Sequence, residues 1–124
     1  MNPNDEDFSP VEALLDSASH GDLQGIQKLI DAGVDVNSQN EEETALLLAS
    51  INGHSSVVSS LIKLGANINH QNQFVKTALI LAVTNGHIDV VKELMKAKAD
   101  KKIADQGNTA MDYAKNKAIQ DALK

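Results

Sequence analysis

Apolar residues recur along the chain in pairs of short segments, and both segments of a pair have the spacing of an α-helix. In residues 55–64 the apolar positions fall at i, i+1, i+4 and i+5, which lie on one side of a helix. They are Val57, Val58, Leu61 and Ile62. Residues 44–52, just before, are apolar on nearly every side, as in a helix that its neighbours bury on most faces. The pair therefore predicts a helical hairpin with a deeply buried first helix.

This pair of segments is repeated along the chain with a nearly constant period. TALLLASINGHSSVVSSLIKLGANIN at 44–69 is followed by TALILAVTNGHIDVVKELMKAKADKK at 77–102. A more divergent copy lies at 12–37, and a shorter fourth copy begins at Thr109. The threonines that open the last three copies are 33 and then 32 residues apart. Such a period predicts supersecondary units stacked in a row, which offer an extended binding surface rather than a catalytic centre.

Glycines mark the expected turns. Asn-Gly-His stands between the two helices at 52–54 and at 85–87, where a left-handed glycine can end the first helix. Gly33 and Gly65 follow the second helices and should also have positive φ. Lys98 takes their place in the third copy, and a left-handed lysine costs about 1 kcal/mol. We therefore expect the third turn to be strained or differently shaped.

The first helix has a recognisable start, which also sets the domain boundary. Ser9, Pro10 and Glu12 form the pattern of a capping box with proline at the first helical position. We expect residues 1–8 to be a disordered acidic tail and 9–124 to be one domain. Its repeats should span about 9–38, 39–71, 72–104 and 105–124, the last being a cap whose second helix, at 116–123, is polar outside.

The period, the helix pairs and the turn residues together resemble the ankyrin repeat family. The residues that carry this resemblance are Gly-His-x-x-Val-Val followed by Leu-Ile at 53–62 and by Leu-Met at 86–95. The resemblance implies an all-α ankyrin-repeat solenoid of four stacked helix-turn-helix repeats with short hairpin-like linkers. Two family positions differ: Ala45, Ala78 and Ala110 replace the proline of Thr-Pro-Leu-His, and Leu47, Ile80 and Asp112 replace its histidine. Leu47 and Ile80 would exchange a polar network between repeats for apolar contact.

Composition narrows the setting and the partners. The chain has no cysteine, and its longest apolar run, at 45–49, is too short to span a membrane. The N-terminal MNPNDEDF lacks the apolar stretch of a secretory signal. We therefore expect a cytoplasmic protein that does not bind membranes. The alternative is a protein delivered to another cell without a cleaved signal peptide.

Charge is distributed unevenly along the chain. The net charge is −6, but residues 1–62 hold eleven acids against one lysine, a balance of −10, and residues 63–124 hold six acids against ten lysines, a balance of +4. This asymmetry either steers a basic partner toward the N-terminal half or reflects drift on a solvated surface. All eleven basic residues are lysines, and because arginine is preferred for phosphate and base contacts, we expect no nucleic-acid partner.

No group of residues predicts catalysis. His54 and His87 hold the same place in adjacent copies, which suits turn closure better than a weak metal site. The serines at 55–60 have no base partner in the sequence and fit a polar helix face. The acids at 41–43 fit a solvated tip better than a cation site. We expect no enzyme activity, no cofactor and no metal.

The resemblance implies binding through the hairpin tips and the exposed ends of the first helices. The matching tip positions are Asn40, Glu41, Glu43, Gln73, Phe74 and Lys76. The matching helix ends are Ile51, Asn52, Thr84 and Asn85, with Leu64 at the end of a second helix facing the same groove. Phe74 is either a partner contact or packs on its own hairpin or the next repeat. As a contact it would join Ile51 and Leu64 in an apolar strip rimmed by Glu41 and Glu43.

We therefore predict a non-catalytic protein–protein interaction module, acting as an adaptor, inhibitor or targeting domain. Its partner is another protein, with a basic surface if the charge asymmetry is used, and the chain itself should be a monomer. The alternatives are a secreted ankyrin-repeat effector that acts on a host protein and a self-associating structural stack.

Overall fold

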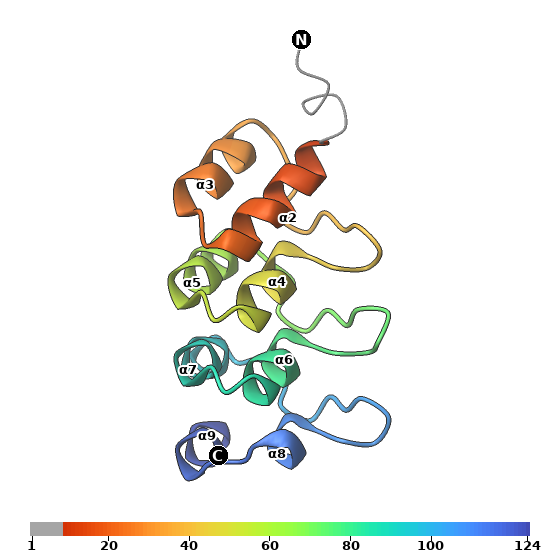
Figure 1. The fold of residues 1–124 in the computed structure, drawn as a ribbon, viewed down its shortest axis with the longest axis vertical. Helices are drawn as coiled ribbons and strands as arrows, with labels where there is room; N and C mark the ends of the chain where they lie inside the picture. The colour runs from red at the N-terminus through yellow and green to blue at the C-terminus, as the bar shows by residue number, and fades with distance from the viewer. Residues whose placement is uncertain (1–8) are drawn as a thin grey trace.

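The chain folds into helical hairpins stacked in single file (Figure 1). The computed structural model describes residues 9–124, so the tail predicted at 1–8 lies outside the described residues. The eight helices of residues 9–124 form four pairs. These are α2 (Pro10–His20) with α3 (Leu23–Asp31), α4 (Ala45–Ile51) with α5 (Ser55–Lys63), α6 (Ala78–Thr84) with α7 (Ile88–Lys96), and α8 (Ala110–Tyr113) with α9 (Lys117–Leu123).

Each helix packs against its partner and against the repeats next to it. The first helices α2, α4, α6 and α8 form one layer, and the second helices α3, α5, α7 and α9 form the other. The core runs without a break through the stack, and the residues of the first helices, such as Leu46, Leu47, Leu79 and Ile80, are almost fully buried. Leu47 and Ile80 thus make the apolar contact predicted for them. The all-α stack of four repeats is confirmed.

Side-chain caps fix where the first helices begin. The Thr44 hydroxyl accepts a hydrogen bond from the N–H of Leu47 at 3.3 Å, and the Thr77 hydroxyl accepts one from Ile80 at 3.2 Å. The Ser9 hydroxyl accepts the N–H of Glu12 at 3.1 Å, which is the first bond of the predicted capping box. The full reciprocal box is formed at Thr109, whose N–H donates to the Asp112 carboxylate at 2.8 Å.

Lys98 adopts the left-handed conformation that a glycine adopts one repeat earlier. Its φ is 66°, and its N–H donates to Met95 at 2.9 Å, just as the N–H of Gly65 donates to Ile62 at 3.0 Å. The turn therefore keeps its shape and places a lysine where glycine is preferred. Of the two predicted outcomes, strain is present and the different turn shape is wrong.

The linkers between repeats are short hairpins that project from the first-helix layer (Figure 1). Asn40 and Glu43 exchange backbone hydrogen bonds of 3.2 and 3.0 Å across a two-residue turn. Both residues of that turn have positive φ, 52° at Glu41 and 66° at Glu42, as a type I′ turn requires. The next hairpin closes one residue later, from Asn72 to Lys76. This extra residue at an exposed tip explains why the repeat period changes from 32 to 33 residues.

Candidate protein-binding groove

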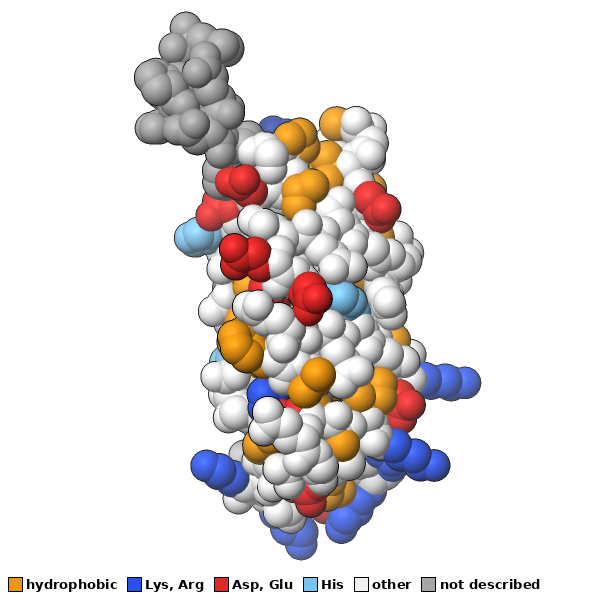
Figure 2. All heavy atoms as spheres, turned by 90° about the vertical axis from the view of Figure 1, so that its right-hand side faces the viewer, with side chains coloured by type: hydrophobic (Ala, Val, Ile, Leu, Met, Phe, Trp, Pro, Cys, Tyr) orange, Lys and Arg blue, Asp and Glu red, His pale blue; other side chains and the backbone are white. Residues whose placement is uncertain are grey.

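The hairpins and the first helices enclose a shallow apolar hollow between the second and third repeats. Its volume is about 260 Å³. It is lined by Glu43, Leu47, Leu48, Ile51, Asn72, Phe74, Lys76 and Leu81. Figure 2, which views the hairpin side, shows acidic side chains toward the N-terminal end of this face and lysines toward the C-terminal end. We call this hollow the groove.

Four of the predicted contact residues meet in the groove. They are Glu43, Ile51, Phe74 and Lys76. Phe74 is 62% exposed and Ile51 is 37% exposed, so both keep apolar surface open to solvent. The N–H of Phe74 donates to the Asn72 side-chain oxygen at 2.9 Å, which fixes the backbone of the hairpin from which the ring projects. Phe74 thus lies at the edge of the hollow.

Other predicted residues lie around the groove without lining it. The exposed tip residues are Asn40, Glu41 and Gln73, and the exposed helix-end residues are Asn52, Thr84 and Asn85. The Asn52 amide donates to the Ser19 hydroxyl at 3.1 Å, and the Asn85 amide donates to the Leu81 carbonyl at 2.7 Å. The two amides therefore already hold bonds within the protein, whereas the tip residues remain exposed.

Leu64 does not face the groove, so that part of the prediction is wrong. It lines a separate hollow of about 230 Å³ between the second helices, together with Leu23 and Ile26 of α3 and Ser60 of α5. As the C-cap of α5, Leu64 belongs to the second-helix layer, and its side chain packs against the core from there. Leu48 and Leu81 complete the apolar lining of the groove instead. Their signal was present, since the first helices are apolar on all sides and therefore also toward the hairpins.

The hairpins are joined to one another by a row of polar contacts beside the groove. Asn72 donates to both carboxylate oxygens of Glu43 at 3.3 Å. One repeat further on, the Lys76 ammonium pairs with the carboxylate of Asp105, which also accepts a hydrogen bond from the Tyr113 hydroxyl at 2.7 Å. The Lys76 ammonium lies 4.8 Å from the centre of the Tyr113 ring. Two residues predicted as free tip contacts, Glu43 and Lys76, are thus also links between repeats.

These contacts shift two pKa values in opposite directions. The hydrogen bond to Asp105 raises the pKa of Lys76 above its ordinary value of 10.5. Burial by itself would raise the pKa of Asp105, but the hydrogen bonds from Lys76 and Tyr113 outweigh it and hold that pKa below 3.8. Both groups are therefore charged at neutral pH, and the pair sits as a fixed ion pair at the C-terminal side of the groove.

The histidines connect each turn to the preceding repeat. His54 Nε2 lies 2.8 Å from the Ser19 carbonyl oxygen, and His87 Nε2 lies 3.0 Å from the carbonyl oxygen of Ile51. Because a carbonyl accepts, each Nε2 carries the proton and donates. Within residues 9–124, no cluster of three or more His, Asp or Glu side chains could hold a metal ion. The same part of the chain contains no helix with the length and apolar character needed to cross a membrane.

Stacked helical hairpins, with projecting linkers and a groove on the first-helix side, define an α-helical repeat protein. A family model described as ankyrin repeats (3 copies) matches residues 14–105 and 61–124. The chain belongs to the ankyrin repeat family. As a class, ankyrin repeat domains are protein-binding modules.

Similar proteins share the repeats and little else of their length. Human ankyrin repeat domain-containing protein 40 is 45% identical over 69 residues, which are 54% of this chain and 19% of that protein. Human mitochondrial disaggregase is 38% identical over 63 residues, 50% of this chain and 9% of its own length. The ankyrin repeat and KH domain-containing protein mask-1 of Caenorhabditis elegans is 37% identical over 60 residues, 48% of this chain and 2% of its own length. The matched region thus spans less than a fifth of each relative.

Proposed function

We propose that the chain is a non-catalytic binding module that holds a segment of another protein in the groove. The observation that carries this proposal is Phe74, whose ring is 62% exposed at the edge of an apolar hollow. Large apolar anchors concentrate binding energy when a partner covers them, and Ile51 supplies a second exposed apolar side chain in the same hollow. An adaptor, inhibitor or targeting role in the cytoplasm fits such a module, and a secreted effector would use the groove in the same way.

The charges around the groove favour a basic partner. Glu41 and Glu42 are exposed at the adjacent hairpin tip, and Glu43 lies at the groove itself. The lysine at the groove, Lys76, is already paired with Asp105. A segment with one apolar side chain flanked by Lys or Arg would therefore match both the hollow and its acidic rim.

A peptide array tests this assignment. Short random peptides selected for binding to the wild-type protein should be enriched in an apolar residue next to Lys or Arg. Phe74→Ala should weaken the binding of these peptides about tenfold or more, since an anchoring aromatic contributes at least about 2 kcal/mol. Gln73→Ala is the matched control, because Gln73 is an exposed neighbour on the same tip that does not line the groove. Equal affinity for Phe74→Ala and Gln73→Ala would show that the groove is not the binding site.

The uneven charge supports a second candidate, a self-associating stack in which the acidic half of one molecule meets the basic half of the next. Light scattering separates the two candidates. A self-associating stack should be larger at low salt and dissociate at high salt, because screening weakens contacts between exposed charges. A mass equal to one chain at every salt concentration supports the monomeric module.

A further inference from the structure

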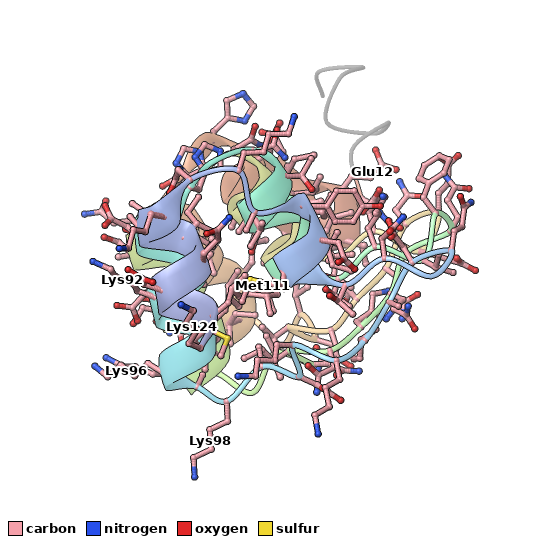
Figure 3. The ribbon with its side chains drawn as sticks, turned by 90° about the horizontal axis from the view of Figure 1, so that it is seen from below. Glu12, Lys92, Lys96, Lys98, Met111 and Lys124 are labelled. Carbon is pink, nitrogen blue, oxygen red and sulfur yellow. The ribbon has the colours of Figure 1, made fainter. Side chains whose placement is uncertain are left out.

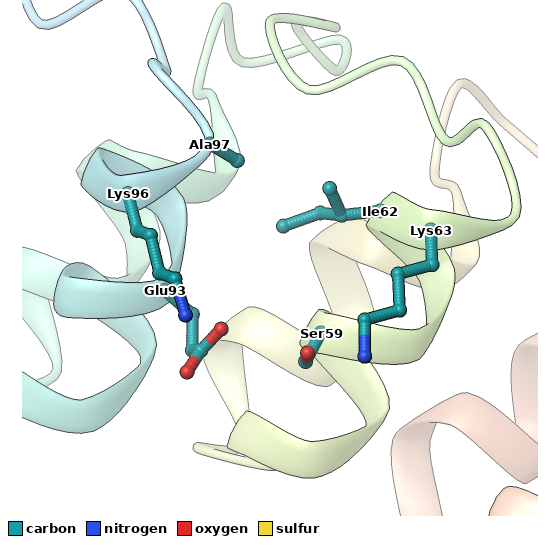
Figure 4. A pocket seen from close by; sticks show the side chains of 6 residues that line it. All are labelled: Ser59, Ile62, Lys63, Glu93, Lys96 and Ala97. Carbon is teal, nitrogen blue, oxygen red and sulfur yellow. The ribbon is translucent and has the colours of Figure 1, made fainter.

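A second hollow lies in the second-helix layer, on the side of the stack away from the hairpins. It has a volume of about 210 Å³ and opens between α5 and α7 (Figure 4). The residues around it are Ser59, Ile62, Lys63, Glu93, Lys96 and Ala97. None of them lines the groove. We call this hollow the back pocket.

The back pocket combines an apolar surface with lysines on both sides. Ile62 projects into the space between the two helices, and Ala97 bounds it on the α7 side (Figure 4). Lys63 and Lys96 stand on opposite sides, one from each repeat, because they occupy the same position 33 residues apart. Among residues 9–124 the ion pairs are formed by other side chains, which leaves both ammonium groups available to a ligand. An apolar centre between two cations suits an amphipathic anionic ligand.

Further lysines extend this positive surface. Lys92 and Lys96 project outward from α7, and Lys98 projects from the turn that follows it (Figure 3). All three are exposed. They lie in the half of the chain whose balance of charge is +4. The field around the back pocket therefore attracts negative charge, opposite to that of the acidic hairpin tip beside the groove.

The chemistry of this surface disfavours two classes of anionic partner. Single-stranded nucleic acid is held by aromatic side chains that stack on bases, and the aromatic residues of 9–124, Phe74 and Tyr113, lie on a hairpin and on α8. A membrane surface is bound by apolar side chains that protrude from a helix, whereas the large exposed apolar residues of 9–124 lie outside α5 and α7. Here the apolar surface is recessed, so the occupant must bring its own apolar group.

We propose that the back pocket binds an acidic protein segment, which places one large apolar side chain on Ile62 and Ala97 and its flanking carboxylates against Lys63 and Lys96. The size fits, because a dry protein cavity of about 150 Å³ already accommodates benzene. The proposal is independent of the groove, whose expected partner is basic.

Glu93 gives the proposal an internal test. Among the charged side chains that line the back pocket it is the acid, and it stands beside Lys96 on α7 (Figure 4). It would repel the carboxylates of an acidic segment. Glu93→Gln should therefore tighten binding, whereas removing either lysine should weaken it. A nonspecific hydrophobic contact would respond to neither change.

Fluorescence anisotropy with a short synthetic peptide that carries one central Leu between paired Glu residues provides the measurement. Lys63→Gln with Lys96→Gln should weaken binding by roughly fivefold or more, since two exposed charge pairs are removed. Ala97→Leu should also weaken it, because the added side chain fills the pocket without changing the charge. The matched control is Lys115→Gln with Lys117→Gln, which removes the same charge from exposed lysines outside the back pocket and should leave affinity nearly unchanged.

Three further probes complete the experiment: the peptide with its central Leu replaced by Ala, a single-stranded oligodeoxynucleotide, and vesicles of anionic phospholipid. All three should bind more weakly than the first peptide. Equal loss in the two double-lysine variants, or tighter binding of the oligonucleotide or the vesicles, would overturn the proposal. Phe74→Ala should leave the binding of the acidic peptide intact, so failure at the groove and failure at the back pocket are distinguishable.

Discussion

The turn glycines meet two separate requirements, and the histidine of the next repeat decides whether both apply. Gly53 and Gly86 have the same left-handed backbone, with φ of 77° and 73°. A Cβ on Gly53 would lie 2.7 Å from the Nδ1 atom of His87, whereas a Cβ on Gly86 would meet nothing within 4 Å. Gly53 is therefore needed both for its backbone conformation and for the space that His87 occupies, and Gly86 only for its conformation.

Substituting each of these glycines separates the two requirements. Gly86→Ala should lower the free energy of unfolding by about 1 kcal/mol, the cost of a left-handed non-glycine residue. Gly53→Ala should cost roughly 1–3 kcal/mol more, because the new methyl group displaces the His87 ring. Urea denaturation of the two variants gives both values.

His87→Ala provides the control for this comparison. It should destabilise the wild type, because the bond from its ring to the Ile51 carbonyl is lost. In the Gly53→Ala background it should cost less, since it also removes the clash. Equal destabilisation by Gly53→Ala and Gly86→Ala would mean that His87 moves aside freely.

Among the elements, the helices are held by the core and the hairpins by polar links at their bases. The Lys76, Asp105 and Tyr113 contact is the strongest of these links, because it joins the third hairpin to the fourth repeat through a carboxylate that is almost fully buried. Burying a charge is unfavourable unless a partner compensates it. The link therefore stabilises the fold only while both charges are present.

Lys76→Met should expose this dependence. At neutral pH the variant should lose about 3 kcal/mol of stability, because Asp105 stays buried without its cation. In the wild type the lowered pKa of Asp105 contributes stability that is present above 3.8 and lost as the pH falls through the folded value. In the variant, burial raises that pKa, and protonation of Asp105 at acidic pH relieves the cost.

The difference in stability between wild type and Lys76→Met should therefore narrow as the pH falls below 3.8. At alkaline pH it should narrow again, because the raised pKa of Lys76 contributes stability that is lost as the pH rises through its folded value, above 10.5. Chemical denaturation across pH provides the measurement. Lys92→Met is the matched control at an exposed site and should change stability by less than about 0.5 kcal/mol at every pH. A pH-independent loss would mean that Lys76 acts through packing alone.

The helices and turns could be predicted because their signals are local. The Val57 and Val58 stripe, the Thr44 cap and Gly53 each act within a few residues, so the sequence pattern carries them. The polar link could not be predicted, since Lys76 and Asp105 are 29 residues apart and meet only after the hairpins are stacked. The groove was predicted in part: Ile51 and Phe74 line it, but the direction of Leu64 depends on which layer the end of α5 joins.

For the whole molecule, the stack places two hollows of different character on opposite layers. The groove lies beside the acidic hairpin tip between the second and third repeats, and the back pocket lies among lysines of the second-helix layer. Both hollows span a junction between consecutive repeats, so each is complete only when two repeats are folded together. Binding at either hollow should therefore respond to the stability of that junction as well as to the residues that line it.

The linear order of contacts decides how far a defect spreads. Leu46 and Ile119 are both nearly inaccessible, at 2% and 1% exposed, but α4 packs against α2, α5 and α6, whereas α9 packs against α7 and α8. Leu46→Ala and Ile119→Ala should each cost about 2–5 kcal/mol locally. Only Leu46→Ala interrupts the middle of the stack, so it should lower hydrogen-exchange protection in all four repeats. Ile119→Ala should lower protection mainly in α8 and α9, because stability in a solenoid is a sum over neighbouring repeats. Equal loss of protection in α2 from both variants would show that the chain unfolds as one indivisible unit rather than repeat by repeat.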